Sequence, residues 1–132
     1  MKKNVETVAL FFDSLSNGDM DTVVSLIDDN IIWHQPGQGV LSGIINGKSN
    51  VLEHLGRFME LSQGTFSSSY DYLTPNGDLV AVAVQFKAAA KGKSISMKGV
   101  DLVKVNNHKI TEFWLFSEFI DEEDKFWTAL AS

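Results

Sequence analysis

The chain has 132 residues and a formal net charge of −6, which fits one domain over residues 1–132 with an acidic surface. It has no cluster of basic and aromatic residues to face a phosphate backbone and no apolar stretch of membrane-spanning length, so we expect no nucleic-acid partner, no membrane partner and a cytoplasmic location. It has no cysteine and only three scattered histidines, which excludes disulfides and thiol catalysis and argues against a metal site.

The first residues of the chain predict two helices that form a hairpin. Apolar residues recur at helical spacing after Asn4, and the segment Ser-Asn-Gly at 16–18 ends the first helix. Asp19 caps a shorter second helix that carries Ile27 on its apolar face and ends at residues 28–30.

A short strand and a third helix follow. Residues 31–34 form an apolar run that breaks into a turn rich in glycine, and residues 47–61 return to helical spacing. We expect four residues of this helix to face inward: Val51, Leu55, Phe58 and Met59.

The rest of the chain alternates with the period of two that is typical of strands. Turn signals at 74–78, 91–93 and 106–109 divide it into strands, of which the last three span 79–88, 94–105 and 110–119. Three helices followed by a meander of antiparallel strands predict an α+β fold, in which a curved sheet covers its concave face with the helices. If the helices do not fill that face completely, a pocket remains between the layers.

His34 ends the first predicted strand beside Trp33, directly before the turn. A histidine at such an edge can be held by the sheet while its ring faces a cavity, and it changes charge near neutral pH, which suits proton transfer. Gln35 and Gln38 can hydrogen-bond near it. The alternative is a hydrogen-bonded histidine that only packs.

Asp101 is the second candidate, because it lies on the same predicted strand face as Val103 and Val105. If the Asn107-His108 turn has two residues, Asp101 lies opposite Trp114, whose indole would desolvate the carboxyl and raise its pKa. The alternative is an aspartate that bonds to neighbouring backbone or points outward at a sheet edge. The apolar residues expected around these groups are Phe12, Val82, Val84 and Phe86.

Several motifs occur in a particular order along the chain. They are Ser-Asn-Gly-Asp-Met-Asp at 16–21, Asp-Asp-Asn at 28–30, Trp-His-Gln-Pro-Gly-Gln-Gly at 33–39, Gly-Lys at 47–48 and Lys-Ile-Thr-Glu-Phe-Trp at 109–114. Over nearly its whole length the chain resembles a SnoaL-like polyketide cyclase or ketosteroid isomerase-related protein of the nuclear transport factor 2-like superfamily. The resemblance implies a cone-shaped barrel of mainly antiparallel sheet around three N-terminal helices, a deep hydrophobic pocket and, commonly, a homodimer.

The resemblance to ketosteroid isomerases carries over to this chain only in part. Asp101 matches their oxyanion-hole aspartate, whereas their catalytic base falls where this chain has His34 and Gln35, and Phe11 replaces their tyrosine in the first helix. Similar SnoaL-type cyclases use a histidine and an acidic residue, and His34 with Asp101 can supply this pair.

We therefore hypothesise an acid/base enzyme of isomerase, cyclase or lyase type that acts on an apolar carbonyl or hydroxyl compound. His34 would move the proton and Asp101 would orient it or donate a hydrogen bond to a developing oxyanion, with no metal or organic cofactor. The alternative is a pocket that binds an apolar ligand without catalysis, or a dimerising module.

A homodimer is expected from an apolar patch on the outer face of the last two strands. Its predicted members are Val100, Leu102, Phe113 and Leu115. Two copies related by a two-fold axis would bury this patch. The alternative is that the C-terminal segment, with Phe126 and Trp127, covers the patch within one chain.

Overall fold

The computed structural model describes residues 2–132, which form helices on one side of a curved sheet. The helices are α1 (Lys2–Asn17), α2 (Met20–Leu26), α3 (Lys48–Leu61) and α4 (Ile120–Leu130). The strands are β1 (Ile27–Gln35), β2 (Gly43–Asn46), β3 (Ser67–Asn76), β4 (Leu79–Ala90), β5 (Lys93–Asn106) and β6 (Lys109–Ser117).

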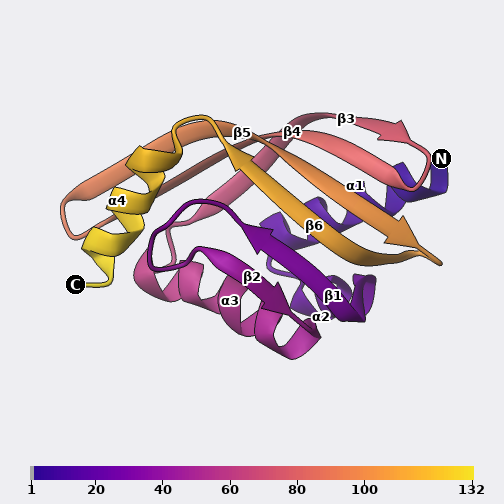
Figure 1. Ribbon diagram of the computed structural model, residues 1–132, viewed down its shortest axis with the longest axis horizontal. Coiled ribbons are helices and arrows are strands. Elements are labelled where there is room, and N and C mark those ends of the chain that lie inside the picture. The colour runs from indigo at the N-terminus through magenta and orange to yellow at the C-terminus, as the bar shows by residue number, and fades with distance from the viewer. Residues whose placement is uncertain (1) are drawn as a thin grey trace.

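The six strands form one sheet in the order β2-β1-β6-β5-β4-β3. Every neighbouring pair is antiparallel except β1 and β6, which run parallel. The long strands arch over α1, α2 and α3, and α4 lies across one end of the arch (Figure 1). The predicted α+β fold with a curved, mainly antiparallel sheet is therefore confirmed.

The main core lies between α1 and the concave face of the sheet. Val8 and Phe11 of α1 pack with Val80 and Val82 of β4, and all four are at most 1% exposed. Burying a side chain of this size stabilises the fold by roughly 1.5–3 kcal/mol. A second cluster lies under α4 and includes Phe58, Trp127 and Leu130, so the ends of α3 and α4 share one apolar contact.

Two boundaries differ from those expected from the sequence. Ile27 begins β1 instead of ending the second helix, and it pairs with Ile110 of β6. Its β-branched side chain is buried in the core, as is favourable in a strand. The short strand β2 lies inside the expected turn region and pairs with β1.

Met59 of α3 was expected to face inward, but it is 45% exposed. It is rotated by about 100° around the helix axis from buried Phe58.

The register between β5 and β6 also differs, because β6 carries a bulge. The two-residue turn has φ of 51° at Asn107 and 63° at His108, as a tight hairpin requires. Val105 then pairs with Ile110, but Lys104 pairs with Glu112, so one residue of β6 is extra. As a result Asp101 lies opposite Leu115 rather than Trp114. A one-residue shift exchanges the two faces of a strand, and this shift determines which β6 side chains reach the interior.

No helix within residues 2–132 is long and apolar enough to cross a membrane.

Candidate ligand-binding pocket

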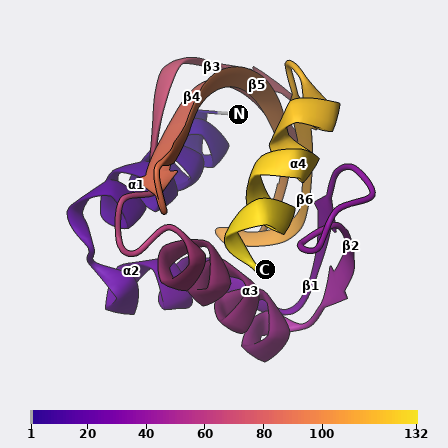
Figure 2. The same cartoon turned by 90° about the vertical axis from the view of Figure 1, so that its left-hand side faces the viewer.

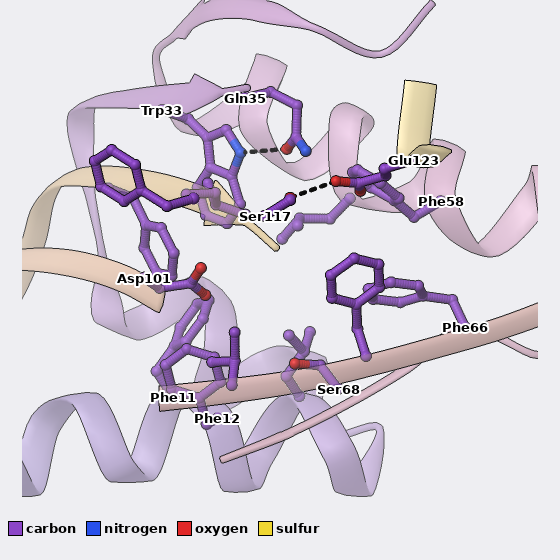
Figure 3. A pocket seen from close by; sticks show the side chains of 17 residues that line it. Phe11, Phe12, Trp33, Gln35, Phe58, Phe66, Ser68, Asp101, Ser117 and Glu123 are labelled. Atoms are coloured by element: carbon purple, nitrogen blue, oxygen red, sulfur yellow. Dashed lines mark hydrogen bonds between the residues drawn. The ribbon is translucent and has the colours of Figure 1, made fainter. Parts of the chain in front are cut away.

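A cavity of about 70 Å³ lies between α1, α3 and α4 and the inner face of the sheet. Figure 3 shows its wall, to which eight aromatic residues contribute. The polar residues in the wall are Gln35, Ser68, Asp101, Ser117 and Glu123. The volume holds roughly five water-sized groups, so the cavity suits a compact ligand with a few polar atoms.

Asp101 projects from β5 into this cavity. Its side chain is buried, with 6% of the residue exposed, and Figure 3 shows no hydrogen bond between its carboxyl and the other lining side chains. Burial raises the pKa of Asp101 to about 8, and the charge of Glu123 adds to the rise. At neutral pH the carboxyl therefore holds its proton and can donate a hydrogen bond into the cavity.

Glu123 faces the same cavity from the first turn of α4 and is buried as well. Its Oε1 accepts a hydrogen bond from the Ser117 hydroxyl, and its Oε2 accepts one from Trp127 Nε1 at 3.1 Å. Burial raises the pKa of Glu123, while these two hydrogen bonds oppose the rise. Because both oxygens already accept donors, Glu123 is the member of the pair that is better suited to carry the negative charge.

Gln35 orders one side of the wall. Its Oε1 accepts hydrogen bonds from Trp33 Nε1 at 3.0 Å and from His54 Nε2 at 2.9 Å. An amide oxygen cannot donate, so the proton of His54 is on Nε2. Burial lowers the pKa of His54 to about 4, with a contribution from Arg57, and the ring is neutral at physiological pH. His54 thus packs in the wall as a neutral hydrogen-bond donor to Gln35.

The prediction that His34 faces the same pocket as Asp101 is wrong. Side chains of β1 alternate, and because Trp33 and Gln35 point into the cavity, His34 points to the outer face of the sheet. There its Nε2 lies 2.7 Å from Glu112 Oε2, and its ring stacks on Trp114 at a centroid distance of 5.2 Å.

The other predicted pocket residues divide into two groups. Five of them line the cavity: Phe12, Trp33, Gln35, Val84 and Phe86. The remaining three do not line it. Val82 is fully buried in the core, Trp114 packs against His34 on the outer face, and Gln38 borders a separate surface groove beside Asp124.

The residues on the outer face differ from those predicted, because the β6 bulge exchanges the two faces of that strand. Phe113 is 1% exposed and Leu115 lines the cavity, so both face inward. Val100 is 47% exposed, and it lies opposite Phe116, which is 58% exposed. The alternative in which Phe126 and Trp127 cover the patch is wrong, since both are buried in the cluster under α4.

The sequence analysis missed three polar residues of the pocket, which are Ser68, Ser117 and Glu123. Glu123 stands three and four residues before Phe126 and Trp127, so helical spacing placed it on the apolar face of α4. A glutamate on an apolar helix face was the available signal.

Within residues 2–132, no three histidine, aspartate or glutamate side chains are grouped so as to hold a metal ion.

Comparison with known proteins gives one family. The model of the SnoaL-like domain matches residues 8–113. A solved structure of a Xanthomonas campestris protein of unknown function with a cystatin-like fold is 37% identical, with a TM-score of 0.90, over 94% of this chain and 97% of that one.

Two further solved structures share the fold at lower identity. An NTF2-like protein of unknown function from Burkholderia pseudomallei is 19% identical with a TM-score of 0.83, over 97% of this chain and 99% of that one. TerC, co-crystallized with polyporic acid, is 17% identical with a TM-score of 0.80, over 98% of this chain and 99% of that one.

Proposed function

We propose that this chain, which belongs to the SnoaL-like domain family, binds a compact apolar carbonyl or hydroxyl compound in the cavity and moves a proton on it. The observation that carries the proposal is the unequal pair of carboxyl groups in one aromatic wall. Asp101 lacks hydrogen bonds to the other side chains of the wall, while Glu123 accepts two. Two carboxyls whose environments differ in this way can serve as acid and base.

The chemistry follows from these two states. The Glu123 carboxylate takes a proton from the carbon next to a ligand carbonyl, and Asp101 donates a hydrogen bond to the carbonyl oxygen as negative charge develops there. Return of the proton to another carbon completes an isomerisation, and all atoms are conserved. The apolar wall excludes water, which strengthens both interactions.

The fold itself supports the use of this cavity for small molecules. TerC, which has the same fold, was crystallised with polyporic acid. The alternative proposal is a pocket that binds such a ligand without catalysis, since one fold hosts many functions.

We test the proposal with butanone as the probe and deuterium exchange at its α-carbons in D₂O as the readout. The wild-type protein is expected to accelerate the exchange. Glu123→Gln should reduce that acceleration by about 100-fold or more, because it removes the base. His34→Ala is the matched control, since His34 lies on the other face of the sheet and its loss should leave the exchange rate unchanged.

Ligand affinity should also depend on pH. Asp101 donates only while protonated, so butanone affinity is expected to be constant below pH 8 and to fall by about tenfold per pH unit well above it. Asp101→Asn should remove this dependence. Binding without exchange would leave the non-catalytic alternative, and absence of binding to the wild-type protein would refute the proposal.

We also propose a homodimer built on the outer sheet face. Val100, Leu102, Trp114 and Phe116 lie together there on the paired strands β5 and β6. An apolar area of this kind is commonly buried by a second copy about a two-fold axis.

A further inference from the structure

A second hollow, of about 420 Å³, adjoins the cavity where α1, α2, α3 and the start of β3 meet. We call it the α3 groove, and its apolar lining is Leu15, Met20, Leu55, Phe58, Met59 and Phe66. Figure 2 shows α2, α3 and the segment that leads into β3 converging at this part of the molecule.

The α3 groove and the cavity share part of their walls. Leu15, Leu55, Phe58, Phe66 and Ser68 line both hollows. The two spaces are therefore separated by no more than the thickness of these side chains. The cavity alone holds roughly five water-sized groups, so a larger ligand has to extend into a neighbouring hollow, and the α3 groove is one such hollow.

The chemistry of the α3 groove indicates which part of a ligand would lie there. Apart from its apolar side chains, its lining contains serines and glycines, with no charged residue. Met20 is 42% exposed and Met59 is 45% exposed. Methionine side chains are flexible and adapt to apolar groups of different shape.

A second groove, which Gln38 borders, also adjoins the cavity, but its lining contains charged residues. It shares Leu115, Phe116 and Ser117 with the cavity, but its outer part carries Asp121 and Asp124. An apolar chain that entered it would desolvate carboxylates, whereas in the α3 groove it would contact Met20 and Met59.

We infer that the ligand is an amphiphile whose oxygen-bearing head lies between Asp101 and Glu123 and whose apolar chain runs through the α3 groove to Met20 and Met59. The inference rests on the proposed function for the position of the head group. It adds the ligand class, a single-headed compound with an apolar chain, and it assigns the α3 groove as the binding site of that chain. Each methylene group that enters the groove should tighten binding by about fourfold, until the chain passes the two methionines.

The test uses a series of straight 2-alkanones, beginning with butanone, and protein labelled with ¹³C at the methionine methyl groups. Butanone is expected to bind without shifting the Met20 and Met59 resonances, and longer ketones should shift both. Met97, which is 5% exposed on β5 and lies outside both linings, serves as the internal control. Met20→Leu and Met59→Leu identify the two resonances.

A pair of variants at one exposed position tests the path independently. Met59→Glu places a charge at the groove and should weaken binding of a long ketone by about tenfold or more, while butanone binding stays unchanged. Met59→Leu keeps the apolar surface and should retain affinity for both.

The outcomes separate this inference from the proposed function. Affinity that rises with chain length, together with the Met20 and Met59 shifts, supports the α3 groove as the chain site. If butanone binding depends on Asp101 but affinity does not rise with chain length, the α3 groove is not the chain site and the proposed function remains intact. If no ketone of the series binds, the proposed function fails and the inference fails with it.

Discussion

The two faces of the β5–β6 pair place carboxyl groups in opposite environments. On the inner face, Asp101 is 6% exposed and has no hydrogen bond to the cavity wall. On the outer face, the Glu112 side chain is 25% exposed and its Oε2 lies 2.7 Å from His34 Nε2. Residue type alone would make Glu112 and His34 the better acid/base pair. The comparison shows that the strand face, and not the residue type, selects Asp101 for the cavity.

The largest expected effect is the pH dependence of the unfolding free energy that Asp101 causes on the inner face. Asp101 has a pKa of about 8 in the folded chain and an ordinary value of 3.8, so the folded state holds an extra proton between these values. The stabilisation is complete below pH 4 and is lost as the pH rises to 8, by up to about 6 kcal/mol. Asp101→Asn should remove most of this loss, as measured by urea unfolding at pH 5 and pH 8.

The matched control is Glu112→Gln on the outer face, which should leave the pH dependence of unfolding close to that of the wild-type protein. A decline from Glu123 should remain in Asp101→Asn, because burial raises the pKa of Glu123 too. Equal losses of stability between pH 5 and pH 8 in wild type and Asp101→Asn would contradict the assignment of Asp101 as the buried acid.

The next effect compares two adjacent aromatic residues of β6 that point to opposite faces. Phe113 is 1% exposed and stacks on Trp33 at a centroid distance of 4.2 Å, whereas Trp114 stacks on His34 on the outer side. Phe113→Ala should cost about 3–5 kcal/mol of unfolding free energy, because it leaves a cavity in the core. Trp114→Ala should cost about 1 kcal/mol, because its surroundings are partly solvated. Urea unfolding measures both, and equal losses would mean that the faces are assigned wrongly.

Much of the fold could be predicted from the sequence, because apolar spacing is a local property. The helix at 47–61 and the three hairpin turns lie where the pattern placed them. Asp101 was placed correctly on an inward strand face, because it alternates with buried Val103 and Val105. The order of the elements predicted a curved sheet with the helices on its concave face, and the family resemblance implies the same arrangement.

The candidate site was less predictable, because it depends on which face each strand turns inward. The apolar run at 31–34 does not alternate, so it could not show that Trp33 faces inward and His34 outward. The β6 bulge follows a normal two-residue turn and has no signal of glycine, yet it reverses Phe113 and Trp114. Glu123 enters the site through the packing of α4, a long-range contact that strand pairing does not reveal.

The smallest expected effect on folding concerns the outer face. If two copies pair there, Val100→Glu would place two carboxylates in the interface and should shift the protein from dimer to monomer in sedimentation at micromolar concentration. The unfolding free energy of each chain should change by less than about 1 kcal/mol, because Val100 is 47% exposed within one chain. Val100→Thr keeps the shape of the side chain without adding a charge and should remain dimeric. A wild-type protein that sediments as a monomer would refute the dimer, and the apolar residues of the outer face would then be exposed to solvent.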